Sequence, residues 1–183
     1  MSTKIITKPR LSIKAQALAT GLAIVGAVVI PQIFHILGMV SGTGTAPGET
    51  FLPMHLPIIL VGLLAGPYAG AVAGAAGPLL SFLLTKMPVA SALPFMMIEL
   101  FAYGLFAGLL RNAKMPSVAK VALAQILGRV VRAAAILFAV YVLSGESIGV
   151  ASVWMSVVKG LPGLALQWSL IPLIVYRVEN HKA

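Results

Sequence analysis

The chain has 183 residues, of which 60% are hydrophobic and only 9% are charged, and its mean hydropathy is +1.03. Soluble globular proteins carry about 25% charged residues, so this composition excludes a water-soluble domain and indicates an integral membrane protein. The absence of cysteine excludes disulfides and thiolate metal sites. We interpret the net charge of +9 first as a membrane-topology signal and expect no nucleic-acid partner. The apolar runs are continuous rather than alternating, which predicts helices and excludes a β-barrel.

The first apolar stretch follows a basic tail and has no formal charge from residue 15 to residue 48. Residues 15–40 would span about 39 Å at 1.5 Å per residue, which is longer than the apolar region of a cleaved signal peptide. We therefore expect a retained first helix, bent near Pro31. Residues 41–53 are rich in Gly, Thr and Pro, and this composition predicts a loop with little regular structure.

Residues 55–85 are too many for one span and too few for two full ones, but Gly66 and Pro67 offer a break near the middle. Two short helices there give six spans in total, with both termini cytoplasmic. The nine basic residues then inside are Lys4, Lys8, Arg10, Lys14, Arg111, Lys114, Lys120, Arg177 and Lys182, and the two outside are Lys86 and Lys159. One long helix would leave six against five, so the positive-inside rule favours six spans.

The remaining spans are expected over residues 95–110, 118–144 and 161–176, with a semi-polar outer segment at 145–160. The predicted fold is an all-α integral membrane protein: one domain over residues 1–183, forming a six-helix transmembrane bundle. Short spans interrupted by Gly and Pro are typical of the binding cavity of a transporter. Tilting of the helices and local thinning of the bilayer explain them equally well.

Charged residues inside the spans are costly and normally face a cavity or a partner. Met96, Glu99 and Tyr103 fall on one helix face, and Gly104 lies on the other. In the fifth span, the side chains that share a face are Gln125, Arg129 and Arg132. We expect Arg129 to extend to the cytoplasmic headgroups. For Glu99 and Arg132, mutual pairing and ligand contact both stay open.

Small residues recur every fourth position in two helices. In the second series, Gly70 and Gly74 are expected to form a packing ridge, because Pro67 interrupts the helix before them. The first series comprises Ala15, Ala19, Ala23 and Ala27. Internal helix packing is the ordinary explanation of such spacing, and a docking face for another protein is the alternative.

The sequence predicts neither a metal site nor a phosphate-binding loop. No second ligand lies three or four residues from His35, His55 or His181, so no metal site is predicted. The glycines of the first loop are followed by Glu49 and Thr50 without the lysine of a phosphate-binding loop. Any energy for transport must therefore come from partners or an ion gradient.

At this point the chain resembles a known family across nearly its whole length. The basic tail, the alanine series in KAQALATGLAIVGA, the segment MHLPIILVGLLAGPYAGAVAGAAGPLLSFLL and six short spans are similar to the substrate-binding S component of an energy-coupling factor (ECF) vitamin transporter. This resemblance implies a vitamin binder in a prokaryotic plasma membrane that works with a T component and two cytoplasmic ATPases. It implies that only those partners use ATP, that the alanine series docks on the T component, and that the protein topples in the membrane to release its cargo.

The expected ligand site lies between the first outer loop and the outer ends of the fourth and sixth helices. Its candidate residues are Phe51, Met54, His55, Met96, Glu99, Tyr103, Arg132 and Trp168. Cobalamin is the first candidate ligand and pantothenate, whose carboxylate Arg132 would bind, is the second; folate, riboflavin and queuosine precursors stay open. The alternatives are a structural subunit without ligand and a membrane-embedded enzyme, which the lack of any Asp for a metal site disfavours.

Overall fold

A computed structural model describes residues 11–142, 155 and 157–180. In this part of the chain every regular element is helical, and six helices are long and apolar enough to cross a membrane. The elements are α1 (Ile13–Val40), α2 (Ala46–Phe51), α3 (His55–Ala65), α4 (Pro67–Thr85), α5 (Leu93–Leu109), the short 3-10 helix η1 (Leu110–Asn112), α6 (Ser117–Tyr141) and α8 (Leu161–Asn180). The predicted all-α six-helix bundle is thus confirmed.

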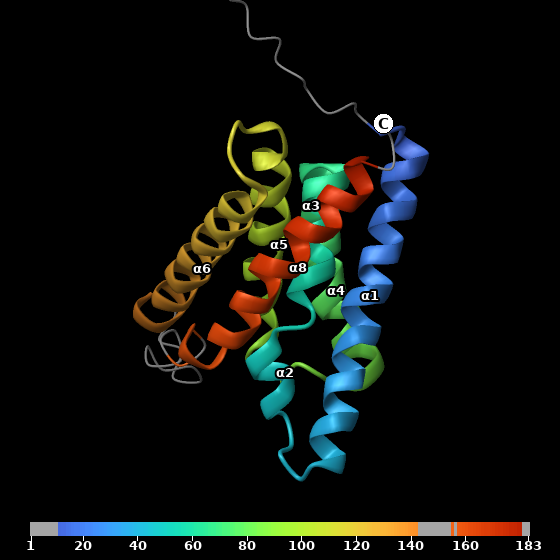
Figure 1. The fold of residues 1–183 in the computed structure, drawn as a ribbon. Coiled ribbons are helices and arrows are strands. Elements are labelled where there is room, and N and C mark those ends of the chain that lie inside the picture. Colours follow the sequence, from blue (N-terminus) through green and yellow to red (C-terminus); the bar gives the residue numbers. More distant parts are fainter. Residues whose placement is uncertain (1–10, 143–154, 156, 181–183) are drawn as a thin grey trace, which may run out of the picture.

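The helices run alternately up and down, and α1 begins at the same end of the bundle at which α8 ends (Figure 1). At the opposite end, α2 forms a short cap below α3 (Figure 1). Here the sequence-based expectation of an irregular loop over 41–53 was wrong, because Ala46–Phe51 is helical. Pro47 suits the first turn of a helix, and Thr45 Oγ1 donates a 2.9 Å hydrogen bond to Glu49.

The break between α3 and α4 falls at Gly66, as predicted. Gly66 has a φ of 110° and its N–H caps α3 by donating to the carbonyl of Gly62. Residues other than glycine rarely adopt this backbone conformation, and Pro67 then suits the first position of α4. Because α3 has only 11 residues, α2 and α3 together make up one span over Ala46–Ala65. In α1 the helix continues through Pro31.

Glycine brings α4 and α5 into direct backbone contact. A Cβ atom added at Gly104 would collide with the carbonyl of Gly70, and one added at Gly74 would collide with the carbonyl of Leu100. We call Gly70, Gly74 and Gly104 the glycine seam. It confirms the predicted ridge, and Gly62 of α3 joins it, since a Cβ atom there would meet the carbonyl of Gly104.

The alanines of α1 divide between the interior and the surface. Ala23 and Ala27 are buried, and Ala27 lies against Gly77 of α4. For these two residues the structure shows internal packing, while docking through the four-alanine series is a prediction that the structure does not test. Ala15 and Ala19 are partly exposed, and docking there stays a prediction.

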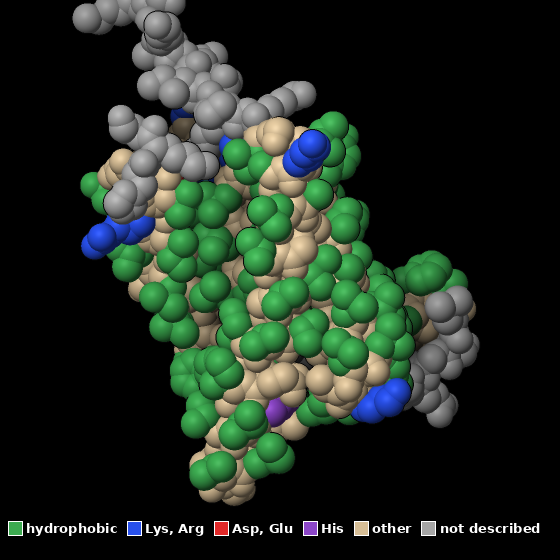
Figure 2. Space-filling view, turned by 90° about the vertical axis from the view of Figure 1, so that its right-hand side faces the viewer, with side chains coloured by type: hydrophobic (Ala, Val, Ile, Leu, Met, Phe, Trp, Pro, Cys, Tyr) green, Lys and Arg blue, Asp and Glu red, His purple; other side chains and the backbone are tan. Residues whose placement is uncertain are grey.

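The exposed face of the bundle is apolar. Figure 2 shows one side covered almost continuously by hydrophobic side chains, with Lys and Arg near its ends. Leu18, Leu22 and Leu84 are each more than 60% exposed. In water this exposure would promote aggregation, whereas lipid tails solvate it. The bundle is therefore a multi-pass membrane protein.

Candidate functional site

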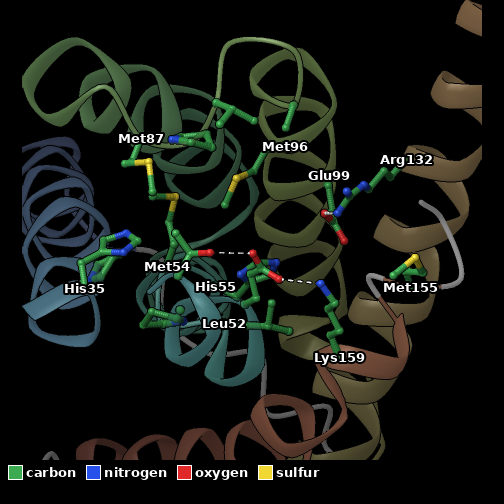
Figure 3. A pocket seen from close by; sticks show the side chains of 18 of the residues that line it. His35, Leu52, Met54, His55, Met87, Met96, Glu99, Arg132, Met155 and Lys159 are labelled. Carbon is green, nitrogen blue, oxygen red and sulfur yellow. Dashed lines mark hydrogen bonds and ion pairs between the residues drawn. The ribbon is translucent and has the colours of Figure 1, made fainter. Parts of the chain in front are cut away.

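A cavity of about 500 Å³ opens at the end of the bundle capped by α2. Its walls come from α1, α2, α3, α5, α6 and the 87–92 connection, so segments distant in sequence meet here. Most of the lining is apolar, and Figure 3 shows Met54, Met87 and Met96 in this wall. The polar members of the lining are His35, Thr45, Glu49, His55, Glu99, Arg129, Arg132 and Lys159.

Glu99 is the most buried charge in the cavity wall, at 1% exposure. Its two carboxylate oxygens are used separately: the Tyr103 hydroxyl donates to one at 2.9 Å and Arg132 Nη1 donates to the other at 2.6 Å. The ion pair is visible in Figure 3. Pairing of Glu99 with Arg132, which the sequence left open, is therefore present, and both residues also border the cavity.

Tyr103 lies behind Glu99 and does not line the cavity. Its ring is fully buried, 5.2 Å from the ring of His55, and it packs against Gly128 of α6, where a Cβ atom would collide with it. Tyr103 thus orients the carboxylate of Glu99 from within the core. His55 itself is 4% exposed, borders the cavity, and has a buried Nδ1 atom without a hydrogen-bond partner.

Arg129 is placed differently from the expectation. It borders the cavity, and its Nε atom is buried without a hydrogen-bond partner. The interpretation that Arg129 extends to the cytoplasmic headgroups was therefore wrong. The signal for the correct position was already in the sequence, since Arg129 and Arg132 share one helix face.

At the rim of the cavity, Lys159 Nζ lies 2.9 Å from Glu49 Oε2, and both side chains are about half exposed. Figure 3 marks the interaction of Lys159 with a dashed line. The two residues are 110 positions apart, and nothing in their local sequence indicated the contact. The ion pair ties the α2 cap to the segment that precedes α8.

A buried amide network supports the floor of the site. Gln125 of α6 donates to Gln167 Oε1 at 2.8 Å, and Gln167 of α8 donates to the carbonyl of Leu52 at 3.2 Å. Leu52 has a left-handed backbone with a φ of 50° and lines the cavity. The network therefore fixes a strained residue of the wall from two other helices.

Three of the predicted ligand residues lie outside this cavity lining: Tyr103, described above, Trp168 and Phe51. Trp168 donates through Nε1 to Gln125 Oε1 at 2.7 Å, so it belongs to the amide network. Phe51 packs on Phe34, with ring centroids 5.5 Å apart. Of the predicted set, the structure brings together in the cavity wall Met54, His55, Met96, Glu99 and Arg132.

Some predictions concern residues that the structure does not describe. The outer segment 145–160 and Glu146 lie largely or wholly outside the described residues, as do Lys182 and the tail before residue 11. Among the described residues, no group of three or more His, Cys, Asp or Glu side chains gathers in a way that could hold a metal ion.

Comparison with known proteins identifies one family. The family model described as "ECF transporter, substrate-specific component" matches residues 13–175. No curated protein and no solved structure matches the chain.

Proposed function

The chain belongs to the family of substrate-specific components of ECF transporters, and from this premise we propose that it binds a small water-soluble vitamin in the α2-end cavity for uptake. Members of this family are substrate-binding subunits of transporters, so the chain is not an enzyme. The observation that carries the proposal is the cavity itself: about 500 Å³, mostly apolar, with a few convergent polar groups at one end of a six-span bundle.

The volume of the cavity bears on the choice between the two candidate ligands. Pockets of about 300 to 1,000 Å³ enclose drug-sized molecules. Pantothenate fits within about 500 Å³, whereas cobalamin is several times larger than pantothenate and exceeds this volume. Pantothenate, the second candidate from the sequence, therefore becomes the first, and its size class includes several other vitamins.

The proposed orientation places the cavity on the outer side and both termini in the cytoplasm of a prokaryotic cell. The charge distribution supports it, because the connection between α5 and α6, which carries Arg111 and Lys114, lies at the end opposite α2 (Figure 1). Since the chain has no cysteine, single cysteines can report on this topology. Thr43→Cys should react with an impermeant maleimide in intact cells and Lys114→Cys only after lysis; the reverse pattern would contradict the orientation.

We further propose that uptake requires a T component and two cytoplasmic ATPases, because this chain has no phosphate-binding loop of its own. Only the partners would then use ATP. Ala15 and Ala19 are the part-exposed members of the alanine series and stay candidates for the contact with the T component.

A thermal-shift screen of the purified protein against water-soluble vitamins tests the proposed function. A compound that binds only the folded state stabilises it by RT ln(1 + [L]/Kd), about 2.7 kcal/mol at 100 times Kd. We expect a single small vitamin to raise the melting temperature in a saturable way. A structural subunit, the second interpretation, would show no stabilisation by any vitamin, and that result would contradict the proposal.

A further inference from the structure

The charges of the described residues around the cavity do not balance. Its lining includes three cations, Arg129, Arg132 and Lys159, and two carboxylates, Glu49 and Glu99. Lys159 is paired with Glu49 at the rim, and Arg132 is paired with Glu99 inside. One positive charge is left over, and it belongs to Arg129. Among residues 11–142, 155 and 157–180, no carboxylate lies within ion-pair distance of it.

Three of the residues that line the cavity carry unused hydrogen-bonding atoms. Arg129 Nε, Arg132 Nε and His55 Nδ1 are all buried and have no hydrogen-bond partner in the structure. All three residues line the cavity, and His55 is 4% exposed. A buried donor without a partner is costly, and more so when it is charged. An uncompensated cation within a membrane span normally faces a ligand or a partner.

We propose that the ligand of this cavity carries a carboxylate, and that Arg129 binds it. This inference rests on the proposed function, since it names the chemical class of the compound that the site receives. Arg132 lies in the same cavity lining, where Glu99 holds its Nη1. The His55 side chain is a neighbouring polar group of the lining, suited to a hydroxyl or amide of the ligand.

The magnitude of the excess charge selects a carboxylate over a phosphate. The described lining has one uncompensated positive charge, which a carboxylate neutralises. A phosphate monoester carries about −1.5 to −2 at neutral pH and would leave negative charge buried in the same space. A neutral or cationic vitamin would leave Arg129 without a partner.

Replacing Arg129 should lower ligand affinity without lowering the stability of the ligand-free protein. In Arg129→Gln, the carboxylate loses its charged partner, so affinity should fall about 10- to 100-fold. The ligand-free protein, however, loses only an uncompensated cation, so its melting temperature should stay equal or rise. Arg129→Lys keeps the charge without the planar fork and should give an intermediate affinity.

The experiment uses matched pairs of probes that differ in the charged group alone: pantothenate and panthenol, nicotinate and nicotinamide, biotin and biotin amide. Each is titrated into the purified full chain and followed by thermal shift and by isothermal calorimetry. Arg177→Gln removes the same charge from an exposed position at the far end of α8 and serves as the matched control. We expect one carboxylate to bind and its neutral partner to bind at least about tenfold more weakly. Arg129→Gln should abolish this preference, and Arg177→Gln should retain it.

Several results would overturn the inference while leaving the proposed function intact. These are equal binding of a neutral partner compound, unchanged carboxylate affinity in Arg129→Gln, or strongest binding of a vitamin without a carboxylate. A lower ligand-free melting temperature in Arg129→Gln would also overturn it, since it would show that Arg129 stabilises the fold without a ligand. If no vitamin of any charge binds the wild-type chain, the proposed function itself fails.

Discussion

Where α4 crosses α5, the glycine seam lets two backbones touch, and no polar side chain is needed to hold them. Five residues toward the α2 end, the same helix α5 presents Glu99, which is held by Tyr103 and Arg132 and borders an open cavity. Five residues are about one and a half turns. The seam packs α5 closely against α4, and the polar groups of α5 lie beside the cavity, where Tyr103 and Arg132 orient Glu99.

In this short chain, the same helix thus contributes to the packing scaffold and to the cavity wall. Small residues allow close helix approach in lipid, where the hydrophobic effect between helices is weak. Polar atoms buried in the same environment need hydrogen-bond partners, either from the protein or from a ligand. The seam and the cavity should therefore respond differently to substitution, and the following changes test that difference.

The largest effect is expected at the glycine seam. Gly104→Leu places a side chain where the carbonyl of Gly70 already lies, so α4 and α5 must separate. Overpacking costs about 1 to 3 kcal/mol and more when backbone must move, so we expect loss of folded protein on size-exclusion chromatography in detergent. The matched control is Gly21→Leu in α1, where a Cβ atom meets nothing within 4 Å; similar losses in both variants would contradict the seam.

The buried ion pair should give the next largest effect. Glu99→Gln leaves the guanidinium of Arg132 without its carboxylate. Losing one partner of a buried pair costs about 3 to 5 kcal/mol, and the 22% exposure of the Arg132 side chain places the expected loss at about 3 kcal/mol or less. The ligand-free melting temperature should fall and should partly recover in Glu99→Gln/Arg132→Gln. Without such recovery, the pair is not what stabilises this region.

These two sites also mark what the sequence could predict. The break at Gly66–Pro67 and the seam follow from Gly and Pro spacing, because steric rules act within a few residues. The shared face of Arg129 and Arg132 was visible too, but helical periodicity alone does not say whether a face meets lipid or a cavity. The Glu49–Lys159 pair depends on the assembled bundle, so no local pattern contained it.

The amide network should give an intermediate effect. Gln167→Leu leaves the carbonyl of Leu52 and the amide of Gln125 without their partners. Each unsatisfied buried group costs about 1 to 3 kcal/mol, so the melting temperature should fall and amide exchange near Leu52 should accelerate. Ser169→Ala on the same helix removes an exposed hydroxyl that donates to the carbonyl of Ala165 and should change neither quantity. Unchanged exchange near Leu52 in Gln167→Leu would separate the network from the cavity wall.

The rim ion pair should matter least for stability. Lys159→Met removes the contact with Glu49, but both side chains are about half exposed, and such pairs contribute about 0.2 to 1 kcal/mol. Lys86→Met removes a charge that lies over the ring of Phe82 instead of beside a carboxylate and provides the comparison. A double-mutant cycle with Glu49→Gln measures the coupling directly, and a coupling above about 2 kcal/mol would show that the rim is more buried than we infer.

The most direct test of the account asks whether the vitamin occupies the cavity. Met96→Trp places a larger ring on a residue that lines the cavity and so reduces its volume. Leu84→Trp adds the same ring to an apolar position that is 72% exposed. Both variants are titrated with the compound that most stabilises the wild-type chain. We expect Met96→Trp to fold but to lose the ligand-induced rise in melting temperature, and we expect Leu84→Trp to retain it. A full rise in Met96→Trp would contradict the assignment of the cavity as the binding site.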